Sequence, residues 1–214
     1  MSARRQSKDP LERLDTPACV TRALVRYLPA LSGMNVIEPC TGENAITRVL
    51  QAEAGCCVSA FDIEPRDAGV TQADTLTPGF FEHIAVKYGS EIAIVTNTPF
   101  SAAAKYWRRT QHFALVALLV RITWLEPAKD REDVRDPDAI IIVPRVRFTG
   151  PGAIDPETGK PYTGGDSATV CWAIWAHEDR FLPTRSIYRV NRRELAELST
   201  ARSSQPLLDA AEVA

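Results

Sequence analysis

Long apolar runs and cysteine clusters are both missing from this sequence. No apolar stretch approaches the roughly 20 residues of a membrane-spanning helix, and the first ten residues are too polar for a secretory signal, so we expect a cytoplasmic protein. The five cysteines are an odd number without C-x-x-C spacing, which argues against a disulfide framework or a zinc site. His83, His112 and His177 lie far apart, so we expect no bound metal.

A strong charge of either sign is also absent. The 214 residues carry a formal net charge of −2, and 45% apolar with 24% charged residues is ordinary for one globular domain. Residues 1–100 have 9 Lys or Arg against 12 Asp or Glu, whereas residues 101–193 have 15 against 11. This excess of positive charge toward the carboxy terminus permits contact with nucleic-acid phosphates without demanding it.

Short runs rich in β-branched residues alternate with amphipathic stretches, a pattern typical of an α/β fold built on a mainly parallel sheet. Strands are predicted at residues 35–38, 56–61, 71–76, 91–96, 114–122, 139–148 and 169–177. Helices are predicted at residues 15–28, 43–54, 101–113 and 125–135.

The same patterns divide the chain into three parts. We expect a flexible arm at residues 1–14, one domain at 15–180 and a partly disordered carboxy-terminal extension at 181–214. Within the domain, residues 149–168 are rich in Gly, Pro, Asp and Thr and show no apolar periodicity. Long loops of this kind are usually functional or mobile, so this one is either a substrate loop or a disordered segment.

A tight turn, Glu38-Pro39-Cys40-Thr41-Gly42, joins a predicted strand to a predicted helix. A glycine there lets the backbone approach a ligand, and the helix start offers free N–H groups. Asp62 ends the next strand, where nucleotide-binding α/β folds place a carboxylate that accepts hydrogen bonds from ribose hydroxyls. Each feature alone also fits an ordinary turn or helix cap.

A third feature, Asn97-Thr98-Pro99-Phe100, follows the apolar run at 91–96. It places a side-chain amide, a rigid proline and an aromatic ring at the carboxyl end of a predicted strand, where ligands bind in parallel α/β sheets. The alternative is a plain turn in which Phe100 anchors the core.

Together these segments resemble a known family. Glu38 to Gly42, followed by Glu43-Asn44-Ala45, is similar to the cofactor-binding motif of class I S-adenosylmethionine-dependent methyltransferases, and residues 97–100 resemble the Asn-Pro-Pro-Phe or Tyr motif of amino methyltransferases. Thr16-Pro17 is similar to the segment that packs over the cofactor's methionine part. Over residues 15–178 the combination most resembles the DNA N6-adenine methyltransferases of phages and prophages, found in a bacterial host or phage-infected cell.

The resemblance implies a Rossmann-like, mainly parallel seven-stranded sheet with helices on both faces. It also implies S-adenosylmethionine as cofactor and S-adenosylhomocysteine as product. Glu38, Cys40 and Gly42 would surround the methionine part, Asp62 would hold the ribose, and Ile63 and Asp74 would contact the adenine. The full set of implied cofactor-binding residues is Thr16, Pro17, Glu38, Pro39, Cys40, Gly42, Asp62, Ile63, Asp74 and Asn97.

The implied catalytic residues are Asn97, Thr98, Pro99 and Phe100. Asn97 and the carbonyl of Thr98 would hold the target amino group and aim its lone pair, while Phe100 would stack on a flipped adenine. Thr98 stands where the family has its first proline, so we expect a less rigid loop. Asn44 replaces a small residue of many relatives and could cap the helix, adopt a left-handed backbone or narrow the pocket.

The expected function is therefore methylation of the N6 amino group of adenine in DNA, with DNA as the partner. Related loops also serve enzymes that methylate RNA bases or protein glutamine, and a non-catalytic binding protein with this fold is a third alternative. Candidate DNA contacts are the 149–168 loop and five basic side chains, each of which could instead be a solvated surface residue: Lys105, Arg108, Arg109, Arg145 and Arg147.

Overall fold

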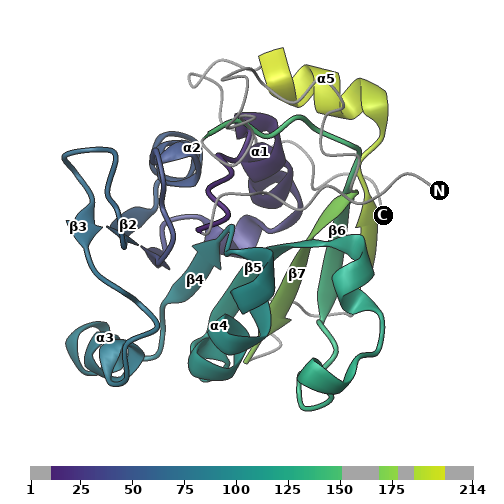
Figure 1. Cartoon of the computed structure of the whole chain (residues 1–214). Coiled ribbons are helices and arrows are strands. Elements are labelled where there is room, and N and C mark those ends of the chain that lie inside the picture. Colours follow the sequence, from purple (N-terminus) through teal and green to yellow (C-terminus); the bar gives the residue numbers. More distant parts are fainter. Residues whose placement is uncertain (1–10, 151–168, 178–185, 201–214) are drawn as a thin grey trace, which may run out of the picture.

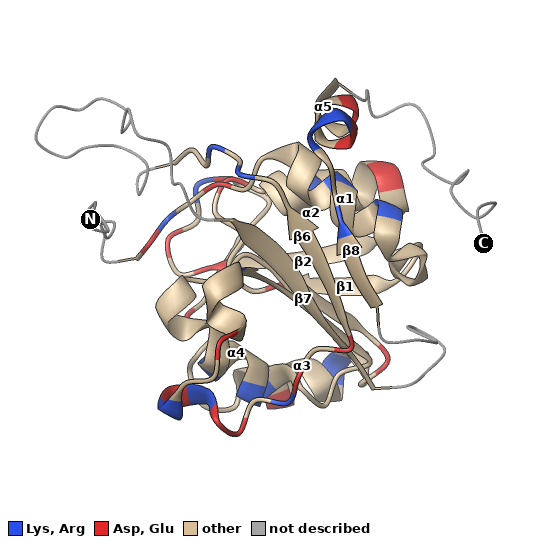
Figure 2. Ribbon diagram, turned by 90° about the vertical axis from the view of Figure 1, so that its right-hand side faces the viewer, with Lys and Arg blue, Asp and Glu red and all other residues tan. Residues whose placement is uncertain are grey.

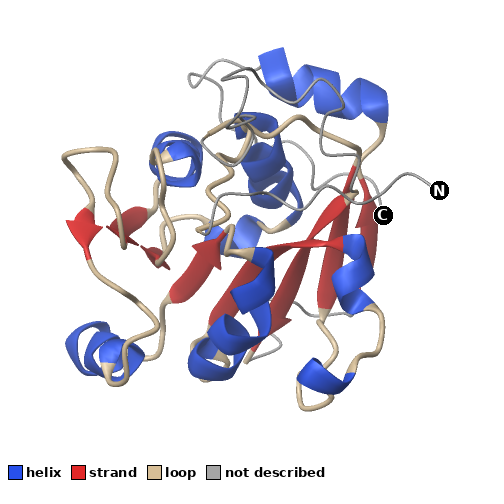
Figure 3. Cartoon of the chain, viewed as in Figure 1, coloured by secondary structure: helices blue, strands red, loops and turns tan. Residues whose placement is uncertain are grey.

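The structure is a computed structural model that describes residues 11–150, 169–177 and 186–200. They form one twisted sheet with helices on both faces (Figure 1 and Figure 3). The strands are β1 (Asn35–Glu38), β2 (Cys57–Asp62), β3 (Thr71–Gln72), β4 (Ala93–Thr96), β5 (Leu115–Arg121), β6 (Ala139–Val143), β7 (Val170–Ala176) and β8 (Ser186–Arg189). The α-helices are α1 (Ala18–Tyr27), α2 (Ala45–Ala54), α3 (Phe80–Tyr88), α4 (Ala103–Thr110) and α5 (Arg192–Thr200).

The sheet has eight strands in the order β3-β2-β1-β4-β5-β7-β6-β8. All neighbouring pairs are parallel except those of β7, which runs antiparallel to both β5 and β6. The sheet is thus mainly parallel, as predicted, but the expected count of seven strands is wrong because β8 adds an edge strand. The strand order reverses direction between β1 and β4, the place where open α/β sheets bind ligands.

The central strands are apolar throughout because both faces of the sheet are covered. In β5, alternate side chains belong to different cores: Leu115, Ala117 and Leu119 face one way. Val116, Leu118 and Val120 face the other way. This two-residue alternation explains why the sequence shows an unbroken apolar run.

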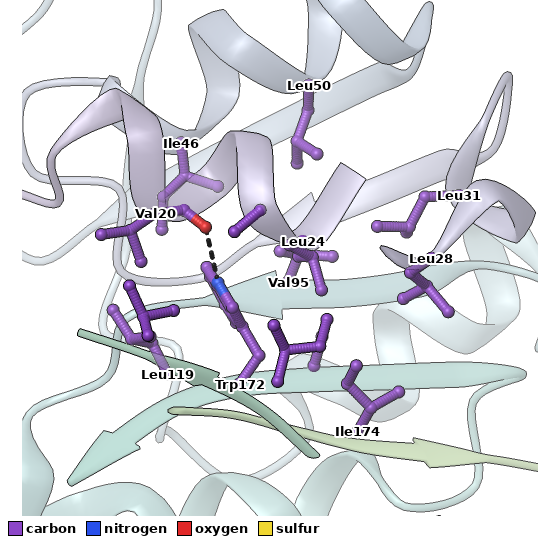
Figure 4. Close-up of a cluster of buried hydrophobic side chains, with 14 of the residues drawn as sticks. Val20, Leu24, Leu28, Leu31, Ile46, Leu50, Val95, Leu119, Trp172 and Ile174 are labelled. Atoms are coloured by element: carbon purple, nitrogen blue, oxygen red, sulfur yellow. Dashed lines mark hydrogen bonds between the residues drawn. The ribbon is translucent and has the colours of Figure 1, made fainter. Parts of the chain in front are cut away.

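On one face, α1 and α2 pack over the sheet around Trp172 (Figure 4). The indole of Trp172 is fully buried, and its N–H donates to the backbone carbonyl of Val20 on α1 at 2.9 Å. This hydrogen bond satisfies a polar group that burial would otherwise leave unpaired. It also fixes how α1 lies on β7.

On the opposite face, α3 and α4 cover the sheet with aromatic side chains. Phe81 of α3 meets Tyr106 of α4 edge to face, with ring centroids 6.3 Å apart. Trp107 packs beside Trp175 of β7 at 6.2 Å. These contacts hold α4, and with it the segment that precedes α4, at a fixed height above β4 and β5.

Arg22 joins three helices in the first core. Its guanidinium Nε donates to Glu53 of α2 at 2.8 Å, and Nη1 donates to the carbonyl of Leu198 on α5 at 2.8 Å. Residues 186–200, which the sequence placed in an extension outside the domain, therefore supply β8 and α5 to the same fold. The predicted boundary at residue 180, the residues beyond 200 and residues 1–10 all lie outside the described part of the chain.

Three further predictions need correction. Residues 125–135 are not an α-helix: short 3-10 turns occupy Ile122–Leu125 and Lys129–Arg131, since Pro127 interrupts the helical hydrogen bonds. The strand predicted at 139–148 ends at Val143, before Pro144, and the strand at 71–76 shrinks to Thr71–Gln72. The helix α3, bracketed by Gly79 and Gly89, was not predicted. A 3-10 turn (Phe100–Ala102) precedes α4, and another (Pro29–Leu31) follows α1.

Candidate functional site

A pocket of about 200 Å³ opens at the carboxyl ends of β1, β2 and β4, at the point where the strand order reverses. Parallel strands end at the same edge of a sheet, so turns far apart in sequence meet there. The predicted site residues that line the pocket are Thr16, Glu38, Pro39, Cys40, Gly42, Asp62, Ile63, Asp74, Asn97 and Pro99. Pro17, Thr98 and Phe100 do not line it.

The turn after β1 is joined to the end of β2 by a hydrogen bond from a backbone N–H to a side-chain carboxylate. Gly42 N–H donates to Asp62 Oδ2 at 2.8 Å, and Glu64 N–H donates to Oδ1 at 2.9 Å. The two bonds hold the carboxylate in place and leave it further lone pairs for ligand hydroxyls. Gly42 has φ +58, and Asn44 has φ 62, so of the alternatives for Asn44 the structure shows a left-handed backbone.

Glu38 lies at the floor of the pocket and is fully buried. The hydroxyl of Thr47 donates to Oε2, whereas Oε1 has no hydrogen-bond partner among the described residues. Burial raises the pKa of this carboxyl to about 8, with the Thr47 hydrogen bond opposing the rise. A buried acceptor without a partner costs free energy, so a cationic or N–H ligand group would be favoured at this position.

A chain of hydrogen bonds joins four residues that line the pocket. The Cys40 thiol donates to Tyr106 Oη at 3.0 Å, Tyr106 Oη lies 2.8 Å from Thr75 Oγ1, and Thr75 donates to the carbonyl of Pro39 at 3.1 Å. Burial raises the pKa of Cys40 to about 12 and also raises the pKa of Tyr106. Cys40 is therefore a neutral thiol that shapes the pocket and is no nucleophile. Tyr106, on α4, was not predicted as a site residue.

Asn97 extends the pocket to the end of β4. Its Nδ2 donates to the carbonyl of Leu14 at 2.9 Å, which fixes the orientation of the amide. With Nδ2 occupied, Oδ1 is the end of the amide that can accept a hydrogen bond from a ligand. Pro99 lines the same pocket, so two of the four predicted catalytic residues contribute side chains to it.

The other two predicted catalytic residues, Thr98 and Phe100, are not among the residues that line the pocket. Thr98 is buried, 3% exposed, and its hydroxyl has no partner among the described residues. Phe100 is half-buried, with the Arg121 guanidinium carbon 4.7 Å from its ring centroid. Its N–H donates to the Glu12 carboxylate at 2.9 Å. The Phe100 ring therefore packs beside Arg121 and does not line the pocket.

Residues 11–16 cross the mouth of the pocket, although the sequence assigned residues up to 14 to a flexible arm. On the β2 side, Arg13 pairs with Glu64 at 2.6 Å and Asp15 pairs with Arg66. At the other end, the backbone of Asp15 pairs with Thr149. We call residues 11–16 the strap. Apart from Thr16, sequence analysis missed it, since its contacts join residues at least 51 positions apart.

The candidate DNA-binding side chains do not share one environment. Arg108 is held by Asp133 at 2.6 Å, which neutralises it. On α4, Lys105 is exposed and Arg109 is half-buried, and Arg145 and Arg147 are exposed in the segment after β6. Around α3 and α4, acidic and basic positions are mixed (Figure 2). Most of the predicted substrate loop, residues 151–168, lies outside the described residues.

Two absences concern only the described ranges. Among residues 11–150, 169–177 and 186–200, no group of three or more His, Cys, Asp or Glu is arranged to hold a metal ion. Within those same ranges, no helix has the length and apolar character needed to cross a membrane.

No protein-family model matches the sequence, and no curated protein matches it. Several solved structures are similar to it. The methyltransferase subunit of a type I restriction-modification system from Streptococcus thermophilus matches with a TM-score of 0.58 and 9% identity, over 86% of this chain and 51% of that chain. The M protein of the type I restriction enzyme EcoKI matches with a TM-score of 0.48 and 12% identity, over 85% and 49%. TrmN from Thermus thermophilus matches with a TM-score of 0.41 and 16% identity, over 73% and 48%.

The chain spans about half the length of these solved proteins. At 9% identity the likeness to the Streptococcus thermophilus subunit concerns the fold and not the substrate. The mixed eight-stranded sheet and the pocket at its strand-order reversal agree with that likeness. The chain therefore has the same fold as this methyltransferase subunit.

Proposed function

We propose that this chain transfers a methyl group from S-adenosylmethionine to the N6 amino group of adenine in DNA. The observation that carries the proposal is that Asn97 lines the same pocket as Glu38, Gly42 and Asp62. A side-chain amide whose nitrogen is already occupied offers its oxygen to an incoming N–H group. Such an acceptor suits an amino substrate.

The pocket fits the proposed cofactor in two respects. Glu38 Oε1 is a buried acceptor without a partner, as a site for an ammonium group requires. Gly42 brings its backbone against the Asp62 carboxylate, whose remaining lone pairs suit ribose hydroxyls. Ile63, 45% exposed at the same pocket, offers an apolar surface for an adenine ring. When bound, S-adenosylmethionine supplies a methyl carbon activated by positively charged sulfur.

The protein's part in the reaction is positioning. The exocyclic nitrogen of adenine is a poor nucleophile because its lone pair is delocalised into the ring. Asn97 Oδ1 and the backbone carbonyl of Thr98 accept hydrogen bonds from its two N–H groups, which favours a pyramidal nitrogen. Pro99 restricts the backbone between Thr98 and Phe100, so the two acceptors keep their spacing.

The DNA strand reaches the pocket only if the target base leaves the helix, since a stacked base cannot enter it. We assign the 149–168 segment as the substrate loop, with Lys105, Arg109, Arg145 and Arg147 as phosphate contacts. Phe100 can stack on the base only if its ring leaves the place beside Arg121. Arg108 is excluded from this set because Asp133 holds it.

The proposal is tested by incubating the pure protein with methyl-labelled S-adenosylmethionine and unmethylated duplex DNA, single-stranded DNA, RNA or protein, followed by nucleoside or residue identification. We expect N6-methyladenine in DNA and a loss of at least about 100-fold in Asn97→Ala, the effect of removing a positioned catalytic acceptor. Gln111→Ala is the matched control, because it removes an exposed amide at the far end of α4.

Two other outcomes would change the proposal. Label found only in RNA bases or in glutamine would replace DNA as the substrate and keep the chemistry. No binding of S-adenosylmethionine by the wild-type protein would overturn the enzyme assignment and favour a binding protein with this fold.

A further inference from the structure

The pocket is strongly acidic for a site that would take a zwitterionic ligand. Five carboxyl groups line it: Glu12, Asp15, Glu38, Asp62 and Asp74. S-adenosylmethionine carries two positive charges, which suit such a lining, and one carboxylate, which does not. Like charges repel strongly where burial weakens solvent screening, so the ligand carboxylate needs a cation of the protein.

Two cations line the pocket among the described residues, Arg13 and Arg66. Arg13 pairs with Glu64, a carboxylate with a 57% exposed side chain outside the pocket lining. Arg66 is the more buried of the two, with 21% of its side chain exposed against 31% for Arg13. It also lies directly over the glycine turn.

Arg66 lies so close to this turn that no side chain would fit at Gly42. A Cβ at Gly42 would lie 2.8 Å from Arg66 Nη2 and 3.0 Å from Asp15 Oδ1. Glycine is therefore required there by space as well as by its φ of +58. The guanidinium and the turn that carries the cofactor motif form one surface.

The guanidinium of Arg66 is only partly used. Nη1 and Nη2, at the end of the guanidinium, both donate to the Asp15 carboxylate. Nη1 also donates to Glu43, which does not line the pocket, at 2.9 Å. Nε is buried and has no partner among the described residues. The side edge formed by Nε and Nη2 therefore keeps unused N–H donors. Two parallel N–H groups on one edge match the two oxygens of a carboxylate.

We propose that this side edge of Arg66 binds the carboxylate of the cofactor's amino-acid part, so that Arg66 and Glu38 together recognise that part by its two opposite charges. The inference rests on the proposed function, because it needs S-adenosylmethionine in this pocket. Asp15 then has a positioning role: by holding the end of the guanidinium it directs the side edge, and it ties the strap to the bound ligand.

The test compares two ligands that differ only in the carboxylate, S-adenosylmethionine and decarboxylated S-adenosylmethionine. Their dissociation constants are measured by calorimetry for the wild type, Arg66→Ala, Arg66→Lys and the control Arg48→Ala. Arg48 is a neighbouring arginine that pairs with Asp67 outside the pocket.

We expect the wild type to prefer S-adenosylmethionine, Arg66→Ala to lose at least about 10-fold of that preference, and Arg66→Lys to lose part of it because ammonium lacks the planar edge. Arg48→Ala should keep the wild-type preference. Equal weakening of both ligands in Arg66→Ala would overturn the inference, since a residue that only holds the strap would act on both, and the proposed function would stand. Failure of the wild type to bind either ligand would instead overturn the proposed function.

Discussion

At the scale of single residues, burial strongly changes the acidity of Glu38. Burial raises its pKa to about 8, so around neutral pH the ligand-free protein holds this carboxyl mainly protonated. In the unfolded chain the pKa of a glutamate has its ordinary value of about 4.3. The folded state thus binds one proton more than the unfolded state between these two values.

This difference predicts a pH dependence of stability. A group whose pKa is raised on folding stabilises the protein below its unfolded pKa, and that stabilisation is lost as pH rises toward 8. We expect the melting temperature of the ligand-free wild type to fall more between pH 5.5 and 8.5 than that of Glu38→Gln, measured by circular dichroism. Parallel pH profiles for the two proteins would show that Glu38 is not the titrating group.

The residues at the strand ends were predictable, and those beside them were not. Glu38, Asp62 and Asn97 end three parallel strands, and parallel strands end at one edge, so pattern and spacing sufficed to group them. The position of the Phe100 ring depends on its packing against Arg121, which no local sequence pattern predicts. The same holds for Arg66, whose partner Asp15 lies 51 positions away.

At the scale of elements, prediction followed the strength of the periodic signal. The strands β1, β4, β5 and β7 are apolar β-branched runs, and each was predicted within two residues of its observed bounds. Prediction failed where proline entered, at 125–135, and where an element was short, at α3 and β8. Short elements depend on tertiary packing for their stability, so their own sequence carries a weak signal.

The clearest dependence between elements is the buried pair that joins α1 and α2. The side chains of Arg22 and Glu53 are 11% and 3% exposed, and Arg22 also reaches the carbonyl of Leu198. Arg22→Ala leaves Glu53 buried without its partner, which we expect to cost about 3–5 kcal/mol of unfolding free energy in urea titrations.

Two comparisons make this prediction specific. Arg193→Ala breaks an exposed pair with Glu197 and should leave stability unchanged within error. Replacing Arg22 and Glu53 together by leucine should recover much of the loss, because no buried charge then stands alone. A single Arg22→Ala variant as stable as Arg193→Ala would contradict the assigned role of the pair.

At the scale of the whole molecule, residues far apart in sequence complete one core. Leu198 of α5 and Val190 after β8 are buried in the same cluster as Val20 and Trp172. The strap is tied to the segment after β6 through the backbone pairing of Asp15 with Thr149. We therefore expect the described part of the chain to unfold as a single cooperative unit.

Leu198→Ala tests this cooperativity from the end of the core most distant in sequence. Removing a buried leucine side chain should cost about 2–5 kcal/mol, and the melting curves from tryptophan fluorescence and from circular dichroism should shift together. Glu197→Ala, on the exposed side of the same helix, is the matched control. Two separated transitions would show that α5 melts independently of the domain.

The two edge strands of the sheet determine whether a strand of another molecule can pair with it. Among the described strands, β3 is one margin and has only two residues, so it presents too little backbone for another chain to pair with. At the other margin, β8 carries the exposed Arg189, a cation that an approaching strand would have to desolvate. Addition of a strand from another molecule is opposed at β3 by the shortness of the strand and at β8 by the charge of Arg189, which lies two residues from the exposed Ile187.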